Sequence, residues 1–421
     1  AMHYVVIGAG PAGVVAAEHL RKYDPASKVT IIGKESEPPY SRMAIPYYLV
    51  KMIKEDGTHL RKTSGHYDQL GIGIEQGRVT AIDSKSNSVS VDGRSVNYDK
   101  LLIATGASPM TPPIPGTDLD GVHNCWDLAD AREIIKYCEP GKRITLIGAG
   151  FIGCIILEAL AESGAEVHVV EMENRMVPRM MNDMAGGMIK QWCENKGVQV
   201  RTSTQVKGIE KKGGALSVSL GEGRDIDTDL VITATGVAPN IDFARDSGIN
   251  AEVGILVNEY LQTSDKDIYA AGDCAQGRDF STGEFSVQAI QPTAVEHGRI
   301  AANNMARGNE HYHTGTVNMN VLATMGLISS SFGLWMGMDG GDDAELLDRD
   351  RFMYLNLQFK DDVLVGASSL GLTEHIGVLR GLIQSKTRLK NWKDKLMDDP
   401  SRLMEAYLAN TQAVGHNAHV L

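Results

Sequence analysis

The chain has 421 residues, enough for two or three domains, and its composition is that of a globular protein apart from 45 glycines, which suit many tight turns. Its net charge of −12 gives no sign of the basic surface that binds nucleic acid, and no apolar run reaches membrane-spanning length. We therefore expect no nucleic acid partner and no membrane span. The sequence opens on a strand pattern rather than a signal peptide, which predicts a cytoplasmic protein.

The cysteines do not form a recognisable redox or metal motif. No two of them have C-x-x-C or C-x₄-C spacing, and no Cys/His cluster has the spacing of a zinc site. We therefore expect no metal, and five structural thiols. They are Cys125, Cys138, Cys154, Cys193 and Cys274.

A glycine-rich loop follows the first predicted strand, residues 4–7, and precedes a helical stretch, residues 14–22. The loop reads Gly8-Ala9-Gly10-Pro11-Ala12-Gly13. In a G-x-G-x-x-G loop the first glycine makes a tight turn, the second admits a pyrophosphate and the third lets helix and strand pack closely. The pyrophosphate then meets the free N–H groups of the helix N-terminus. Glu35, just past the predicted strand 29–32, is the candidate acid for a ribose hydroxyl.

The same unit recurs in the middle of the chain. Residues 144–147 predict a strand, Gly148-Ala149-Gly150-Phe151-Ile152-Gly153 follows, and residues 154–163 predict a helix. Glu171 ends the next predicted strand, 167–170, about 20 residues after the loop, as the motif requires. Its carboxylate accepts the 2′-OH of NAD and repels the 2′-phosphate of NADP, so we favour NADH over NADPH, although Arg175 lies nearby.

The repeat extends beyond the loops. A buried strand at 101–103 ends in Ala104-Thr105-Gly106, and another at 230–232 ends in Ala234-Thr235-Gly236. Before the first of these strands, residues 74–79, 81–82 and 88–91 predict short strands and Asp92-Gly93 a hairpin turn. Between the two strands, residues 111–116 predict a linker, and 198–202 and 216–220 further strands. This pattern predicts a duplicated dinucleotide-binding domain.

The remaining residues predict a third segment and a last block. A strand at 268–271 ends in Gly272-Asp273 and is followed by a helix at 294–305. In the last block, 312–421, residues 317–323 and 351–359 predict strands, and Asp361-Asp362 a turn. Residues 382–397 and 400–408 predict helices.

The order of these motifs resembles the two-dinucleotide-domain flavoproteins, the pyridine nucleotide–disulfide oxidoreductase family, densely over residues 1–310. The resemblance implies an α/β fold with two Rossmann-like domains and a C-terminal α+β interface domain. FAD would bind residues 1–110 and 239–310, and NAD(P)H residues 117–238. Residues 312–421 would form the interface of a homodimer.

The resemblance also assigns cofactor contacts. Asp273 matches the aspartate that binds the FAD ribityl chain, the backbone of Val79 matches the adenine contact, and Gly236 matches a turn near the domain junction. Together with the two loops, the cofactor-binding residues so implied are Gly8, Gly10, Pro11, Ala12, Gly13, Lys34, Glu35, Arg42, Met43, Val79, Ala104, Thr105, Gly106, Gly148, Gly150, Phe151, Ile152, Gly153, Glu171, Thr235, Gly236, Gly272, Asp273 and Thr293.

The flavin-facing segment, residues 40–48, departs from one branch of the family. It resembles the segment of NADH oxidases and coenzyme A–disulfide reductases, but Met43 stands where they carry a redox cysteine. A thioether forms no thiolate or mixed disulfide, so disulfide reduction is not expected. Tyr40 and Arg42 also resemble the reductases of rubredoxin, ferredoxin and nitrite reductase centres, and Arg42 is a candidate pyrophosphate ligand. Ile155 stands where many members of the family carry a buried glutamate near the flavin. We therefore do not expect the proton transfer of those members in this chain.

The sequence therefore predicts an FAD-dependent NADH oxidoreductase with no catalytic side chain. NADH would reduce the flavin, which would pass electrons to an acceptor that we expect to be a redox protein. Two other hypotheses stand beside it: an NADH oxidase or reductase of quinone-like small molecules, and an NADH-sensing flavoprotein that does not turn over.

Overall fold

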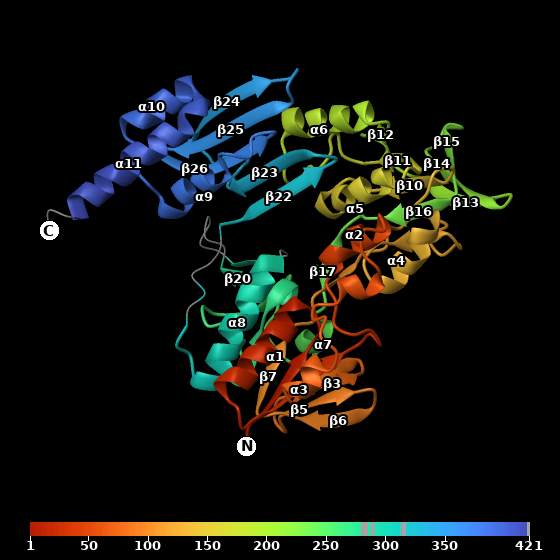
Figure 1. Cartoon of the computed structure of the whole chain (residues 1–421), viewed down its shortest axis with the longest axis vertical. Coiled ribbons are helices and arrows are strands. Elements are labelled where there is room, and N and C mark those ends of the chain that lie inside the picture. The colour runs from red at the N-terminus through yellow and green to blue at the C-terminus, as the bar shows by residue number, and fades with distance from the viewer. Residues whose placement is uncertain (279–284, 288–290, 312, 314–316, 419–421) are drawn as a thin grey trace. The chain divides into compact units, whose positions relative to one another are not determined.

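The computed structural model describes residues 1–278, 285–287, 291–311, 313 and 317–418 (Figure 1). Contacts between residues divide the chain into two compact units. Unit 1 comprises residues 1–110, 126–128 and 237–316, and unit 2 comprises residues 111–125, 129–236 and 317–421. No helix in the described part of the chain combines the length and apolar character needed to cross a membrane.

A five-stranded parallel sheet forms the centre of unit 1. Its order is β19-β7-β1-β2-β3, with β1 at His3–Ile7, β2 at Lys28–Gly33, β3 at Ile72–Gln76, β7 at Lys100–Ile103 and β19 at Ile268–Ala270. β1, β7 and β19 are almost wholly buried, which agrees with their continuous apolar sequences, because a parallel sheet is covered on both faces. The late strand β19 thus completes a sheet begun by the first residues of the chain.

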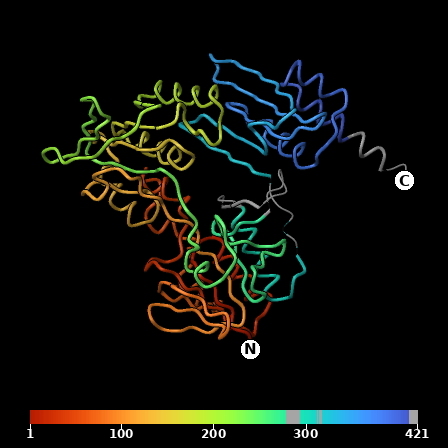
Figure 2. Tube along the Cα trace, turned by 180° about the vertical axis from the view of Figure 1, so that it is seen from behind, coloured from red at the N-terminus to blue at the C-terminus, as the bar shows by residue number. Residues whose placement is uncertain are grey.

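Helices α1 (Pro11–Tyr23) and α8 (Gln291–Arg307) pack closely in unit 1 (Figures 1 and 2). Gly298 of α8 lies at the crossing, where a Cβ would stand 2.4 Å from the carbonyl oxygen of Ala12. Only glycine permits this approach. The packing holds the segment after residue 290 against the helix that follows the first glycine loop.

The expected single strand at 74–79 is wrong. β3 ends at Gln76, and β4 (Val79–Asp83) begins a separate antiparallel sheet with β5 (Ser88–Val91) and β6 (Arg94–Asn97). Gly77 separates the two sheets, and a Cβ there would lie 2.4 Å from Cγ1 of Val91. The different pairing partners of β3 and β4 reveal this break. The turn at residues 92–93 is confirmed, with φ of +48° and +82°.

Short elements complete unit 1. β8 (Ala107–Pro109) pairs antiparallel with β17 (Val237–Pro239), and β18 (Ile255–Leu256), β20 (Ala275–Arg278) and β21 (Phe285–Val287) form a small sheet. The short helices are η1 (Arg42–Ala44), α2 (Ile45–Leu49), η2 (Glu55–Thr58), α3 (His66–Gln69), α7 (Asp242–Asp246) and η4 (Gly272–Cys274).

Unit 2 repeats the parallel-sheet plan. Its sheet has the order β12-β11-β10-β16-β9, with β9 at Val122–Asn124, β10 at Arg143–Ile147, β11 at Glu166–Val170, β12 at Gln199–Arg201 and β16 at Leu230–Thr233. Its helices are α4 (Leu128–Ile134), η3 (Ile135–Tyr137), α5 (Phe151–Glu162) and α6 (Asp183–Asn195). An antiparallel sheet is formed by β13 (Gly208–Lys212), β14 (Ala215–Ser219) and β15 (Asp225–Thr228).

The last part of unit 2 is an antiparallel sheet with helices. The order β22-β23-β26-β25-β24 joins Met319–Thr324, Leu327–Gly333, Val363–Leu370, Met353–Lys360 and Asp342–Asp348. The helices are α9 (Ile376–Ser385), α10 (Asn391–Asp398), η5 (Pro400–Arg402) and α11 (Leu403–Ala418). The expected helix 382–397 is wrong because Lys386 and Lys390 take left-handed φ of +50° and +51°, which separates α9 from α10.

Direct contacts join the two sheet regions of unit 2. Nδ2 of Asn182, at the N-cap of α6, donates to the hydroxyl of Tyr354 at 2.7 Å, and Nε1 of Trp192 donates to the Met325 carbonyl at 3.1 Å. Residues 111–236, apart from 126–128, therefore share one compact unit with the C-terminal sheet. The three domain boundaries expected from the sequence stay predictions.

Candidate functional site

The first glycine loop has the shape that a bound pyrophosphate requires. Gly8 has φ +115°, and a Cβ there would lie 1.9 Å from the Ala104 carbonyl oxygen. A Cβ at Gly13 would lie 2.0 Å from the Gly8 carbonyl oxygen, whereas a Cβ at Gly10 would meet no atom within 4 Å. The outer glycines therefore serve packing, and the space at Gly10 is open to a ligand.

The second loop repeats this geometry. Gly148 has φ +106°, and its Cβ would lie 2.2 Å from the Ala234 carbonyl oxygen. A Cβ at Gly153 would lie 2.4 Å from the Gly148 carbonyl oxygen, and one at Gly150 would meet nothing within 4 Å.

Each loop leaves the N-terminus of its helix available. Gly10 caps α1 and Gly150 caps α5, and neither makes a side-chain hydrogen bond to its helix. Pro11 begins α1, a position that suits proline because its missing N–H has no helical partner there. The free N–H groups and the helix dipole of each loop favour a phosphate group.

Glu171 is fixed beside the second loop. It directly follows β11, its side chain is buried, and Oε1 accepts the N–H of Ala149 at 2.9 Å while Oε2 accepts that of Glu173 at 2.6 Å. A carboxylate has about four acceptor positions, so these two bonds leave capacity for ribose hydroxyls. The carboxylate is thus held next to the loop where a dinucleotide ribose would lie.

The counterpart of Glu171 in the first unit is Gly33, not Glu35. The N–H of Gly8 donates to the Ile32 carbonyl at 2.8 Å, as that of Gly148 does to Val170 at 2.9 Å, so the residue after Ile32 matches the residue after Val170. Counting from the strand end rather than from the loop would have found this. Glu35 lies two residues farther and accepts a hydrogen bond from the Tyr40 hydroxyl at 2.7 Å. Ribose binding by Glu35 stays a prediction.

Several predicted residues meet at the carboxyl ends of adjacent strands. Gly8 follows β1, Ala104 follows β7, and Gly272 with Asp273 follows β19, which is where open α/β sheets bind their ligands. Burial raises the pKa of Asp273, and the charge of Arg42 opposes that rise. The hydroxyl of Thr105 is already bonded to the Asn240 carbonyl at 2.7 Å, so its backbone is the part left for a cofactor.

The remaining predicted residues differ in their burial and in the elements that carry them. Lys34 follows β2, and burial lowers its pKa with a smaller contribution from the charges of Arg42 and Arg78. Met43 is 50% exposed on η1, and Thr293 is buried in the first turn of α8. In unit 2, Phe151 and Ile152 form the first turn of α5, and Thr235 and Gly236 follow β16.

Arg175 does not offer a free guanidinium to a 2′-phosphate. Its Nε donates to the Met181 carbonyl at 2.7 Å and its Nη2 to the Pro178 carbonyl at 2.9 Å. Its Nη1 contacts Asn174 at 2.8 Å and Asp183 at 3.1 Å. The guanidinium of Arg175 therefore binds groups of the segment that follows Glu171.

Two residues near the first loop were missed by the sequence analysis. Trp126 stacks on Arg42, with its ring centroid 5.1 Å from the guanidinium carbon. Nδ1 of His297, a buried side chain on α8, accepts the N–H of Gly272 at 3.3 Å, and its Nε2 lies 3.2 Å from Nε2 of His313. Burial lowers the pKa of His297 to about 3, with a smaller contribution from His313. Neither residue belongs to a local motif, so no sequence signal marked them.

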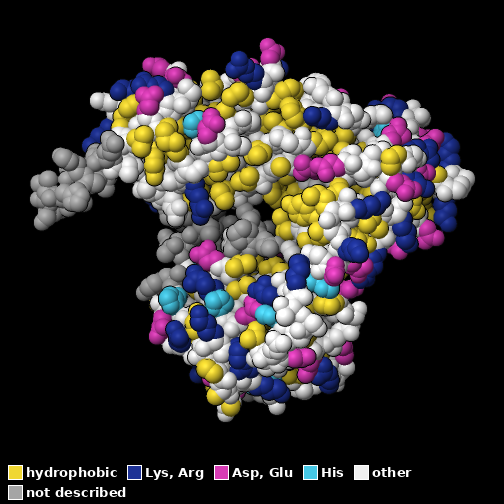
Figure 3. Space-filling model, viewed as in Figure 1, with side chains coloured by type: hydrophobic (Ala, Val, Ile, Leu, Met, Phe, Trp, Pro, Cys, Tyr) yellow, Lys and Arg dark blue, Asp and Glu magenta, His cyan; other side chains and the backbone are white. Residues whose placement is uncertain are grey.

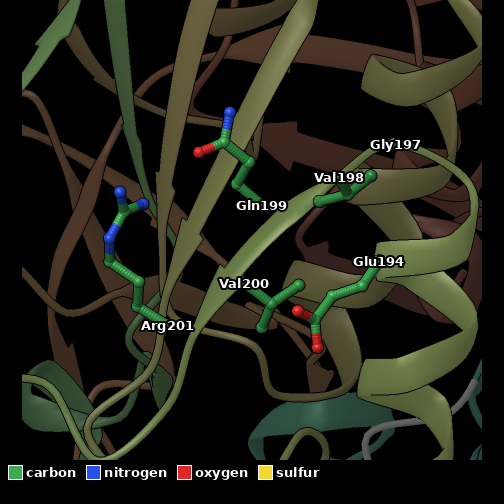
Figure 4. A pocket seen from close by; sticks show the side chains of 6 residues that line it. All are labelled: Glu194, Gly197, Val198, Gln199, Val200 and Arg201. Carbon is green, nitrogen blue, oxygen red and sulfur yellow. The ribbon is translucent and has the colours of Figure 1, made fainter.

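On the face shown in Figure 3, acidic and basic side chains are interspersed. A shallow hollow at the edge strand β12 is lined by Glu194 and residues 197–201 (Figure 4). None of its lining residues belongs to the two loops or to the predicted cofactor set, so it is not the candidate site.

The residues of the first loop fit FAD, and those of the second fit NADH. Both loops have an open central glycine and a free helix N-terminus for a pyrophosphate. Nε of Arg42 is buried without a hydrogen-bond partner among the described residues, which supplies a donor near the first loop. Glu171 supplies an acceptor near the second.

Comparisons with known proteins agree with this reading. The family model described as pyridine nucleotide-disulphide oxidoreductase matches residues 2–298. An NADH oxidase of Methanocaldococcus jannaschii is 37% identical over 315 residues, which cover 72% of this chain and 70% of that protein. The epsilon subunit of an NADH-dependent phenylglyoxylate dehydrogenase of Aromatoleum evansii is 29% identical over 412 residues, covering 97% of each. The structure of an NAD-dependent persulfide reductase from A. fulgidus matches with a TM-score of 0.84 at 28% identity, covering 93% of this chain and 78% of that one.

Proposed function

The chain belongs to the pyridine nucleotide-disulphide oxidoreductase family and is an oxidoreductase that uses FAD and NADH; from that premise we propose that its electrons pass to a separate redox protein. The observation that carries the proposal is the methionine at residue 43, the position that the family resemblance matches to a redox cysteine. All five cysteines are buried, and none lies in the segment 40–48. When bound, FAD takes two electrons from NADH and can release them singly, so no cysteine is needed to couple the two substrates.

The residues of the chain bind and orient the two dinucleotides. We assign the FAD pyrophosphate to the first loop and the N-terminus of α1, with Arg42 as a charged donor. Asp273, at the carboxyl end of β19, accepts hydroxyl hydrogen bonds of the ribityl chain. We assign the NADH pyrophosphate to the second loop and its adenosine ribose to Glu171.

The proposed preference for NADH rests on the charges beside that ribose. The carboxylate of Glu171 is held by two backbone N–H groups, and the guanidinium of Arg175 is hydrogen-bonded to carbonyl groups of its own segment. A 2′-phosphate would meet the carboxylate of Glu171, and the guanidinium of Arg175 is already engaged. We therefore expect NADPH to be a much poorer donor than NADH.

The proposed protein acceptor is supported by the full-length relative. The phenylglyoxylate dehydrogenase protein carries the name of a subunit, and it matches 97% of this chain, including the C-terminal sheet region. The relative named NADH oxidase matches 72% of the chain, which supports oxygen as the second candidate acceptor. Nothing observed favours a sensor that does not turn over.

Anaerobic stopped-flow mixing of the purified protein with NADH, and separately with NADPH, tests the proposal. Rapid loss of absorbance near 450 nm with NADH, and a much slower loss with NADPH, is the expected result. After air is admitted, reduced flavin should persist over many turnover times and reoxidise when a one-electron carrier protein is added. Rapid reoxidation by air alone would overturn the protein acceptor in favour of oxygen, and a protein without flavin would overturn the cofactor assignment.

We further propose that the chain forms a homodimer through the C-terminal sheet and helices, as the resemblance to the family implies. Light scattering during gel filtration measures this directly. A mass near twice the chain mass of 45.5 kDa is expected, and a mass near 45.5 kDa would contradict the dimer.

A further inference from the structure

The guanidinium of Arg42 is held between two aromatic rings. Its central carbon lies 5.1 Å from the ring centroid of Trp126 and 5.9 Å from that of Tyr40, and Nη2 lies 4.0 Å from Oε2 of Glu35. Nε is buried and has no hydrogen-bond partner among the described residues. An unsatisfied buried donor is costly, so this N–H is suited to an oxygen supplied by a ligand.

The rings are themselves fixed by hydrogen bonds. The Tyr40 hydroxyl donates to Oε1 of Glu35 at 2.7 Å and accepts the N–H of Leu128 at 3.3 Å. Nε1 of Trp126 donates to the Ala107 carbonyl at 3.1 Å. Ala107 directly follows the Ala104-Thr105-Gly106 turn, so the tryptophan is anchored at a strand end that borders the first loop.

Arg42 interacts electrostatically with charged groups at two strand ends. Burial raises the pKa of Asp273, after β19, and the charge of Arg42 opposes that rise. Burial lowers the pKa of Lys34, after β2, and the charge of Arg42 lowers it further. β2 and β19 are strands of the parallel sheet whose middle strand, β1, leads into Gly8. The guanidinium therefore belongs to the group of side chains at the carboxyl edge of that sheet, where the dinucleotide binds.

We propose that Trp126 is a positioning residue for Arg42, and that its ring holds the guanidinium so that Nε–H donates to a pyrophosphate oxygen of FAD. This inference rests on the assignment of FAD to the first loop. A mobile arginine would lose side-chain entropy on binding, whereas a stacked one is already ordered. Stacking on a partly buried tryptophan also adds a direct attraction to the cation.

A double-mutant cycle on FAD affinity tests the role. The dissociation constant of FAD is measured by titrating apoprotein and following the quenching of flavin fluorescence. We expect Trp126→Leu to raise it about tenfold, equivalent to ~1.4 kcal/mol, and Arg42→Gln to raise it by about the same factor or more. In the Arg42→Gln background, Trp126→Leu should add little, because the tryptophan acts through the arginine.

Trp392 provides a matched control. It also stacks on cations, with Lys395 at 4.3 Å and Arg402 at 5.1 Å, but it lies in α10 of unit 2. Trp392→Leu should leave FAD affinity unchanged, and Trp126→Phe, which keeps an aromatic face, should retain most of it.

The outcomes distinguish a failure of the cofactor assignment from a failure of the role proposed for Trp126. FAD binding by the wild-type apoprotein checks the cofactor assignment. With that binding intact, multiplicative losses in the double variant would show that Trp126 does not act through Arg42 and would overturn the inference. Unchanged affinity in Trp126→Leu would overturn it as well. Near-ultraviolet circular dichroism of each variant establishes that a loss of affinity does not come from unfolding.

Discussion

The two glycine loops agree in their backbones and differ in the side chains around them. In both, the first glycine approaches a carbonyl of the neighbouring strand end, the third approaches the first, and the second faces open space. Beside the second loop stands Glu171, whereas its counterpart beside the first loop is Gly33. The comparison teaches that the backbone cradle recognises the pyrophosphate common to both dinucleotides, and that the surrounding side chains distinguish them.

The charged groups near the two loops differ. Arg42 and Lys34 lie with the carboxylates of Glu35 and Asp273 at the first site, whereas a carboxylate held by two backbone N–H groups lies beside the second loop. The second loop also has an arginine nearby, but the guanidinium of Arg175 donates hydrogen bonds to the carbonyl groups of Met181 and Pro178 in its own segment. Position in the fold, and not residue type alone, therefore decides which charges a cofactor meets.

Alanine at the first glycine of each loop should have the largest effect and should separate the two sites. Gly8→Ala and Gly148→Ala would place Cβ atoms 1.9 Å and 2.2 Å from carbonyl oxygens at positive φ. We expect Gly8→Ala to yield protein without flavin. Gly148→Ala should keep its flavin but lower the rate of reduction by NADH about a hundredfold, for a distortion costing ~3 kcal/mol.

Flavin content and stopped-flow reduction measure these effects. Gly141→Ala is the control, since Gly141 also has positive φ, +89°, but its Cβ would meet nothing within 4 Å. If Gly8→Ala and Gly148→Ala lost flavin content and the rate of reduction by NADH to the same extent, the assignment of the two loops to different cofactors would be contradicted.

Removing each acid should affect a different cofactor. Glu171→Ala deletes the acceptor of two backbone N–H groups and of the ribose, so the KM for NADH should rise about tenfold or more, with little change for NADPH. Glu35→Ala deletes the acceptor of the Tyr40 hydroxyl and should weaken FAD binding a few-fold, by loosening Tyr40, without changing the KM for NADH. Steady-state kinetics with a dye acceptor and FAD titration check both. A rise in the KM for NADH in Glu35→Ala would contradict the separation.

Acid should also reduce the stability of the region around the first site. Burial lowers the pKa of His297 to about 3, so the unfolded chain binds a proton that the folded chain does not. Stability conferred by the neutral form is therefore present above pH 6.5 and is lost as the pH falls from 6.5 toward 3, by about 2 kcal/mol between pH 7 and pH 5.

The variant His297→Gln keeps a hydrogen-bond acceptor and has no proton to gain. Its thermal midpoint, followed by the release of flavin, should depend less on pH between 7 and 5 than that of the wild type. His313, whose pKa is also lowered by burial, contributes with the same sign and supplies the remaining dependence. An unchanged pH dependence in the variant would show that the histidine beside Gly272 is not the titrating group.

Local patterns predicted the elements that carry the cofactors. The two glycine loops, the turns at 104–106 and 234–236, and the hairpin at 92–93 depend on glycines whose positive φ or close packing is required within a few residues. The strands beside them are buried on both faces, so their apolar runs stand out in the sequence.

Pairing and packing decided what those patterns left open. Residues 72–83 form strands of two sheets, and residues 376–398 form two helices, because strand partners and left-handed residues interrupt continuous patterns. The hydrogen bonds of Gly8 and Gly148 to the preceding strand ends identified Gly33 as the counterpart of Glu171, a match that counting from the loops had missed.

By itself, the sequence determined that the chain has two glycine loops shaped to hold a phosphate, because each loop is formed by contiguous residues. Only the tertiary structure decided that Trp126 stacks on Arg42, that His297 supports Gly272, and that Arg175 is occupied. The partners of the first two contacts lie far apart in the chain, and those of Arg175 depend on the path of a loop. Such contacts are set by how segments pack rather than by local propensity.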